Sequence, residues 1–167
     1  MALPVASAVV LDAEQGLLRS VLGQLPVTND AVCDHVKPAA DLVGKLVNIA
    51  SRCAGFIGKR FDGKLSDSLP DPGLFAEFAG AADTIAGHYE QREYSKAMRS
   101  IMALADSANR YIDEHKPWIM IKDEAQAENV QRVCTQGINM FRSLMIYLTP
   151  VIPAVADKAR VFLAEER

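Results

Sequence analysis

The chain has 167 residues, half of them apolar, and a formal net charge of −3 at pH 7. This length and composition fit one globular domain with a sizeable hydrophobic core. The negative charge argues against indiscriminate nucleic-acid binding, but it is compatible with a local basic site on an acidic body.

The first 35 residues differ from the rest, and we predict one helix within them, over about 11–24. They begin MALPVASAVVL, which is apolar but has no cationic start, and Asp12 and Glu14 follow at once. Such a segment is a poor signal peptide and is too short to cross a membrane. We therefore divide the chain into a divergent, partly helical extension, residues 1–35, and one domain, residues 36–167.

Long stretches of the domain have helical periodicity, and no alternating β-branched run competes with it. The further helices are predicted at about 39–60, 74–90, 92–115, 124–149 and 152–165. Turn residues are dense in 61–73, and Pro117 ends the fourth of these six helices because proline disfavours α conformation in the residue before it. The sequence predicts an all-α fold, an antiparallel helical bundle.

The helix predicted over 39–60 has two faces. Wound at 100° per residue, its apolar residues share one arc: Leu42, Val43, Leu46, Val47, Ile49, Ala50, Cys53, Ala54, Phe56 and Ile57. The opposite arc carries two stripes. One is polar and mostly cationic, with Lys45, Asn48, Arg52 and Lys59; the other is small, with Gly44, Ser51, Gly55 and Gly58.

Each glycine inside a helix lowers helix stability by about 1 kcal/mol relative to alanine, so the glycines of the small stripe indicate a further role. A close approach of another helix or of a ligand would supply one. A solvated face with glycines used for helix packing is the alternative, and the pattern alone leaves both open.

A second polar face lies in the helix predicted over 92–115. Asp106, Asn109, Arg110 and Asp113 recur at i, i+3, i+4 and i+7 and therefore share a side. The other side is apolar, with Tyr94, Met98, Ile101, Ala105, Ala108 and Ile112. After the break at Pro117 the only tryptophan, Trp118, begins a new helix, either as a core residue or as a stacking platform for an unpaired base.

Three segments carry a resemblance: DLVGKLVNIASRCAGFIGKRFDGKL, YEQREYSKAMRSIMALADSANRYIDEHKPW and QGINMFRSLMIYLTPVIP. In order and spacing they resemble the anticodon-binding domain of bacterial methionyl-tRNA synthetases, which belong to class I. The resemblance runs from about Val36 to the C-terminus. It implies a bundle of the class I synthetase anticodon-binding type that binds the anticodon stem-loop of methionine tRNA, anticodon CAU.

The resemblance also implies roles for individual residues. Asn48 and Arg52 match the family's N-x-x-x-R segment, which binds the first anticodon base, a cytosine, and Trp118 after Pro117 matches the ring that stacks on it. Residues i and i+4 of a helix point the same way, so an amide and a guanidinium can share one base edge.

Four further residues are expected to support this site: Lys45, Lys59, Asn109 and Asp113. Asp113 would orient the site, for example by pairing with a cation. Asp106 is an acidic group that could repel wrong partners.

Catalytic signatures are missing from the 167 residues. The H-x-G-H and K-M-S-K-S motifs of a class I synthetase do not occur, nor does a glycine-rich phosphate loop. The three histidines are too dispersed for a metal site, and the three cysteines include no C-x-x-C, as expected of reduced thiols in a cytoplasmic protein. We expect no catalytic residue, cofactor or metal in this chain, since ATP and Mg belong to the family's catalytic domain.

The sequence thus predicts a tRNA-binding module. Whether this module forms part of an enzyme is left open by the sequence. It could be a fragment of methionine-tRNA ligase or work with a catalytic domain in cis or in trans. The alternative is a non-enzymatic interaction module that retained the fold and packs a partner helix on the small stripe. We expect a cytoplasmic monomer with no membrane contact.

Overall fold

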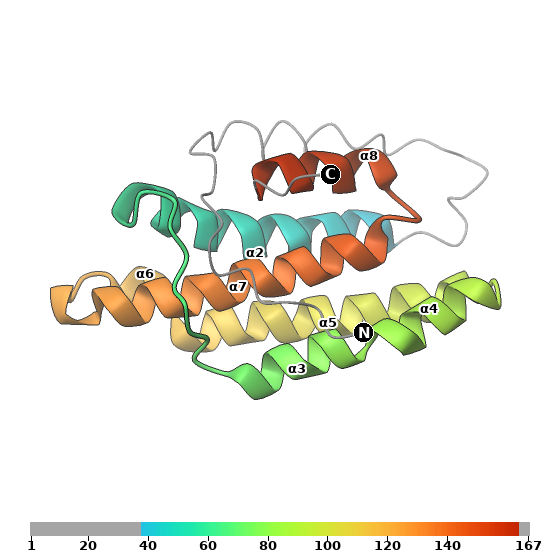
Figure 1. The fold of residues 1–167 in the computed structure, drawn as a ribbon, viewed down its shortest axis with the longest axis horizontal. Helices are drawn as coiled ribbons and strands as arrows, with labels where there is room; N and C mark the ends of the chain where they lie inside the picture. Colours follow the sequence, from blue (N-terminus) through green and yellow to red (C-terminus); the bar gives the residue numbers. More distant parts are fainter. Residues whose placement is uncertain (1–37, 164–167) are drawn as a thin grey trace.

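The structure is a computed structural model that describes residues 38–163, with side chains described for 44–46 and 48–163. The helix predicted over 11–24 lies outside these residues. Within them the fold is all-α, as predicted, and contains no strand (Figure 1). Its elements are α2 (Pro38–Arg60), α3 (Pro72–Gly80), α4 (Ala82–Glu90), α5 (Tyr94–His115), α6 (Pro117–Met120), the 3₁₀ turn η2 (Glu124–Gln126), α7 (Ala127–Leu148) and α8 (Pro153–Phe162).

One predicted helix is divided in two. The stretch 74–90 was expected to be continuous, but α3 ends at Gly80 and α4 begins at Ala82. Ala81 stays in the right-handed helical region and donates its N–H to the carbonyl of Glu77 at 3.1 Å, so the chain bends without leaving helical conformation. Helical periodicity does not detect a bend of this kind. The last predicted helix is also shorter, because α8 ends at Phe162.

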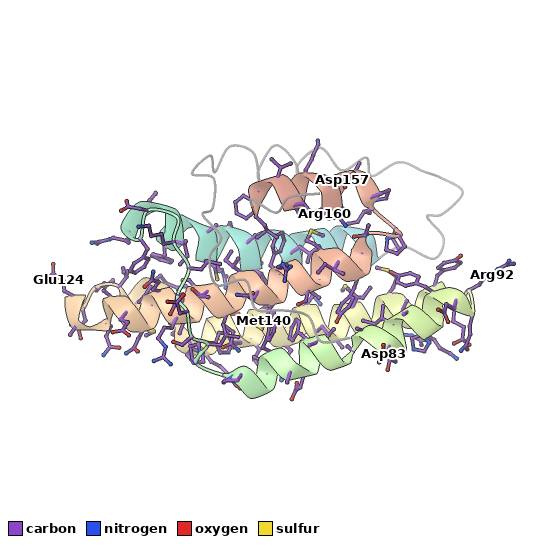
Figure 2. All side chains as sticks on the ribbon, in the orientation of Figure 1. Asp83, Arg92, Glu124, Met140, Asp157 and Arg160 are labelled. Atoms are coloured by element: carbon purple, nitrogen blue, oxygen red, sulfur yellow. The ribbon has the colours of Figure 1, made fainter. Side chains whose placement is uncertain are left out.

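Helix α7 is the centre of the bundle. It lies between α2, α5 and α8 in Figure 1, and its residue Met140, labelled in Figure 2, is completely buried. Helix α7 runs antiparallel to both α2 and α5, whereas α2 and α5 run parallel to each other (Figure 1). Residues 61–93, which include α3 and α4, carry the chain from the end of α2 back along the bundle to the start of α5.

Helix α2 buries the face that its sequence predicts. Its described apolar residues are buried against α7 and α5 or packed on the core: Leu46, Ile49, Ala50, Cys53, Ala54, Phe56 and Ile57. The first and last glycines of the small stripe, Gly44 and Gly58, do not pack against another described helix. A Cβ added at Gly44 or Gly58 would meet nothing within 4 Å.

A glycine of α7, Gly137, lies in a very tight contact with α2. A Cβ built there would lie 2.4 Å from the Sγ of Cys53 and 3.5 Å from the Cδ1 of Ile112. Gly137 therefore allows α2 and α5 to pack directly on α7. The sequence pattern singled out the glycines of α2 and not this one.

Polar side chains of α7 fasten the connection that follows α2. The Oγ1 of Thr135 accepts a hydrogen bond from the Ser66 N–H at 2.9 Å. The Gln136 side chain accepts from the Asp71 N–H at 2.8 Å and donates to the Asp71 carbonyl at 2.7 Å. Because these polar groups are buried and paired, the segment has one position on the bundle.

Two tyrosines join the α3–α4 layer to α7. The Tyr147 hydroxyl donates to the carbonyl of Phe78, and the Tyr89 hydroxyl donates to the Tyr147 carbonyl at 2.9 Å. Tyr94, which was expected on the apolar side of α5, is instead 57% exposed at the first residue of that helix. The apolar side begins at Ala97 and Met98, one turn later.

None of the helices between residues 38 and 163 is both long and apolar enough to cross a membrane.

Candidate functional site

Two ion pairs align α2 with α5. Lys45 Nζ pairs with Asp106, and Arg52 Nη1 lies 2.5 Å from Asp113 Oδ1. The cations are seven residues apart on α2 and the carboxylates seven apart on α5, so each pair recurs after two helical turns. This matched spacing requires the two helices to run in the same direction.

Asn109 lies between the two pairs and has a structural role. Its Nδ2 donates to the Lys45 carbonyl at 3.2 Å and to the Ala105 carbonyl at 3.0 Å. The half-buried amide thus holds α5 against the backbone of α2. Asn109 therefore fixes α2 and α5 together on this surface, and its support of a binding site stays a prediction.

The end of α5 is shaped by a residue with left-handed backbone. Lys116 has φ 49° and ψ 61°, and it both ends α5 and begins α6. Its carbonyl accepts from the N–H groups of Ile119 and Met120 at 2.8 and 3.2 Å. Pro117 is buried as the first residue of α6, where its missing N–H costs no helical bond. Trp118 therefore begins a helix, as the sequence predicted.

Arg52 and Trp118 meet at this corner. The Cζ of Arg52 lies 5.1 Å from the centroid of the indole ring, within the range of a cation–π contact. The same guanidinium bonds Asp113, so one arginine contacts a carboxylate and an aromatic ring. Trp118 is partly buried and packs on the core, so it is a boundary residue that remains partly exposed.

Asn48 and Lys59 extend this surface along α2. Asn48 is exposed one turn before Arg52, and Lys59 is exposed two turns after it. Among the described residues, neither side chain has an ion pair or a hydrogen bond. The structure thus gathers Arg52, Trp118 and Asp113, leaves Asn48 beside them on the same face, and places Lys59 farther along.

The charges of this surface are more balanced than the cationic stripe alone indicates. Lys45 and Arg52 are each neutralised by a carboxylate of α5. Helix periodicity identified both faces separately, but not that they face each other. Periodicity gave no sign of the Arg52–Trp118 contact, because the two residues are 66 positions apart, and only the resemblance placed them at one site.

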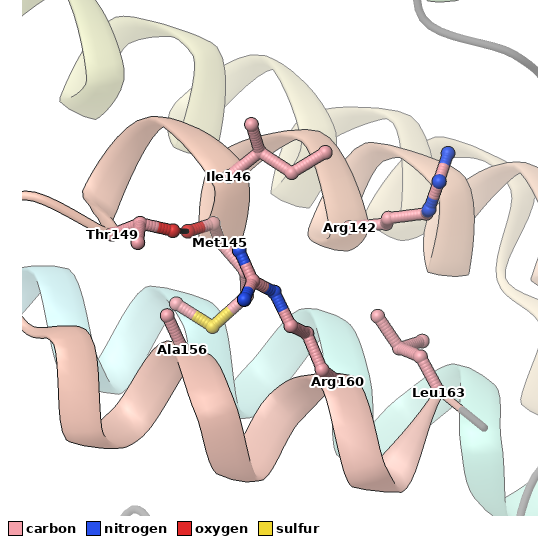
Figure 3. A pocket seen from close by; sticks show the side chains of 7 residues that line it. All are labelled: Arg142, Met145, Ile146, Thr149, Ala156, Arg160 and Leu163. Atoms are coloured by element: carbon pink, nitrogen blue, oxygen red, sulfur yellow. Dashed lines mark hydrogen bonds between the residues drawn. The ribbon is translucent and has the colours of Figure 1, made fainter. Parts of the chain in front are cut away.

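No group of three or more metal-ligating side chains occurs among the described residues. A shallow pocket lies between α7 and α8, where Arg160 points between the two helices (Figure 3). Its lining shares no residue with the surface around Trp118. The other lining residues are Arg142, Met145, Ile146, Thr149, Ala156 and Leu163.

This all-α bundle places a partly exposed tryptophan beside an arginine, and aromatic rings and guanidinium planes are groups on which RNA-binding proteins stack unpaired bases. Residues 67–167 match the family of the anticodon binding domain of methionyl tRNA ligase, and this is more than half of the chain. The chain belongs to that family, whose domain recognises the anticodon of tRNA. The matched range includes Trp118 and Asp113, whereas Asn48 and Arg52 precede it.

Proposed function

We propose that this chain recognises the CAU anticodon of methionine tRNA and that Arg52, Asn48 and Trp118 bind its first base. The observation that carries the proposal is the meeting of Arg52 and Trp118 at 5.1 Å at the corner between α5 and α6. Family membership supports the anticodon as target. The residue roles rest on the geometry of this corner together with the sequence resemblance.

The chemistry of the three side chains suits a cytosine. Its pairing edge presents two acceptors, O2 and N3, and one donor, the N4 amino group. Arg52 offers only donors, while the Asn48 amide offers both a donor and an acceptor. Uracil presents an N–H at position 3, which opposes an arginine donor. Edge contacts therefore discriminate between the two pyrimidines, and the indole face adds stacking of roughly 1–3 kcal/mol for any base.

The ion pair with Asp113 sets the position from which Arg52 acts. In the free protein the guanidinium lies over the indole ring and bonds the carboxylate. A base that stacks on that side of Trp118 displaces the guanidinium from the ring toward the base edge. Asp113 limits how far the arginine can move, so it orients Arg52 during recognition.

The test is a comparison of anticodon stem-loops that carry cytosine or uracil at the first anticodon position. Arg52→Ala and Asn48→Ala should each lose roughly 1–3 kcal/mol of binding free energy and part of the cytosine preference. Trp118→Ala should lose a similar amount but retain more of the preference, since every base has a π face. Thermal melts of each variant separate loss of contact from loss of folding.

A folded Arg52→Ala protein with unchanged affinity and unchanged cytosine preference would contradict the proposal. Glu114→Ala is a matched control, because this residue is exposed on α5 next to Asp113 but makes none of the contacts around Arg52.

The wider activity is that of a methionine-tRNA ligase whose catalytic domain acts in cis or in trans and supplies the chemistry of ATP and Mg. The isolated chain should then show no methionine-dependent pyrophosphate exchange.

The second candidate, an interaction module, is favoured by the open space at Gly44 and Gly58, where a partner helix could approach. Gly58→Leu should abolish partner binding in that case, but leave anticodon binding intact under our proposal.

A further inference from the structure

Two cysteines lie in the core directly behind Arg52. Cys53 of α2 and Cys134 of α7 are both completely buried, and both are free thiols. Anticodon recognition uses neither of them. They are the two described cysteines of the chain, and they lie on the two helices that pack most closely at its centre.

The packing at Gly137 brings the two thiols together. The Cβ of Cys53 lies 3.6 Å from the position of a Cβ at Gly137, and its Sγ lies nearer still. Cys134 is three residues before Gly137, so it projects from the same face of α7 toward α2. The Cys134 thiol raises the pKa of Cys53, which agrees with this packing of two buried sulfurs as neighbours. A bulkier residue at 137 would push α2 away from this face.

We propose that Cys53 and Cys134 form a reversible disulfide that links α2 to α7. The oxidant is a small disulfide such as glutathione disulfide. One cysteine thiolate attacks it, forms a mixed disulfide and releases one glutathione. The second thiolate attacks the protein sulfur of that mixed disulfide and releases the other glutathione, so the protein loses two electrons and the two thiol protons pass to the two glutathione thiolates.

Burial controls when this exchange can occur. The neighbouring Cys134 thiol and desolvation both raise the pKa of Cys53, so the reactive thiolate is scarce while the bundle is closed. No reagent reaches a completely buried sulfur either. The link therefore forms during folding or during local opening of α2, and once formed it is shielded from reductants by the same packing.

The effect of the link is on stability, and it does not depend on RNA binding. A bridge between residues 53 and 134 closes a loop of about 80 residues, and loops of this length give a large reduction in unfolded-state entropy. The oxidised protein should therefore melt roughly 5–15 °C above the reduced protein. Cys33, which lies outside the described residues, is removed from the test by the Cys33→Ala substitution.

The experiment unfolds the Cys33→Ala protein and refolds it in glutathione buffers of increasing oxidised fraction. Free thiols are then alkylated, and peptides are mapped by mass spectrometry. We expect a peptide that joins Cys53 to Cys134 and a higher melting temperature that reverts on reduction. Cys134→Ala in the same background should show no linked peptide and no dependence of melting temperature on the buffer.

Alkylation of both cysteines in the refolded wild-type and Cys33→Ala proteins, even in the most oxidising buffer, would overturn the proposal. Glutathione adducts on either cysteine without a linked peptide would overturn it too. Neither readout needs a Cys53 variant to fold.

Discussion

Lys116 has a backbone conformation that its side chain disfavours. A φ of 49° lies in the left-handed region, which costs a non-glycine residue roughly 1 kcal/mol, and the following proline restricts it further. The conformation persists because Pro117 is buried and because α5 and α6 both depend on this turn. Lys116 thus places Trp118 at the start of α6 at a cost in stability.

Replacing Lys116 tests this interpretation. Lys116→Gly should leave stability unchanged or raise it by up to about 1 kcal/mol, since glycine adopts the left-handed region without strain but loses more chain entropy. Lys116→Val should lower it by more than about 1 kcal/mol, because a β-branched residue fits this region poorly. Chemical denaturation measures both. Equal stability of the two variants would show that the turn relaxes elsewhere.

Among the helices, the contact at Gly137 fixes the separation of α2 and α7. Gly137→Ala should destabilise the protein by about 1–3 kcal/mol, because the new Cβ would lie 2.4 Å from the Cys53 sulfur. The higher helix propensity of alanine offsets part of this loss. In a Cys53→Ala background the same substitution should cost less, and this double-mutant cycle isolates the clash. Additive effects would mean that Cys53 simply rotates away.

The turn between α4 and α5 has a pH-dependent contact. The Glu93 carboxylate accepts a hydrogen bond from Lys96 at 2.6 Å and lies 3.2 Å from the Nδ1 of His88. The bond from Lys96 lowers the pKa of Glu93, with a further contribution from His88. The contact therefore stabilises the fold above the ordinary glutamate pKa, and this contribution is lost as the pH falls through the lowered value.

Thermal melts from pH 7 to about pH 3 should reveal this contribution. Glu93→Gln should melt below the wild type near neutral pH, and the difference should shrink to zero at the acid end. Glu90→Gln, at the exposed end of α4, serves as the control and should not reproduce this pattern. A difference that persists at low pH would assign the effect to packing and not to charge.

Features that depend on neighbours in sequence were predictable, and features that depend on distant residues were not. The buried face of α2 follows from its periodicity, and Trp118 follows a helix start at Pro117 because proline acts locally. The bend at Ala81 leaves the backbone helical, so periodicity does not reveal it. The pairing of Arg52 with Asp113 joins residues that are 61 positions apart, and no local pattern indicates which two helices face each other.

Over the whole molecule, the net charge of −3 and the neutralised Lys45 and Arg52 limit the electrostatic contribution to RNA binding. Lys59 and Arg60 are exposed at the end of α2, and neither has an ion pair among the described residues, so we take them as the cations that contact phosphates. We expect about two phosphate contacts, one for each of these cations. A plot of the logarithm of the association constant against the logarithm of the salt concentration should then have a slope of about −1.4.

Titration of stem-loop binding against salt measures this slope. Replacing Lys59 and Arg60 together by alanine should bring it close to zero, while Lys158→Ala on α8 should leave it unchanged. A wild-type slope several times steeper would require phosphate contacts on another surface, and a slope of zero in the wild type would exclude the contribution of these two cations.

The parallel pairing of α2 with α5 has a consequence for how the chain matures. Arg52 leaves the ribosome long before the residues that it packs with. Asp113 follows 61 residues later, and α7, which fills the centre of the bundle, is synthesised after that. Neighbouring helices such as α4 and α5 can pair as a hairpin, but α2 can dock only after the chain has returned along the bundle. Until then the apolar face of α2 is unprotected, so a nascent chain stalled before α7 is a natural substrate for chaperones and cannot yet recognise an anticodon.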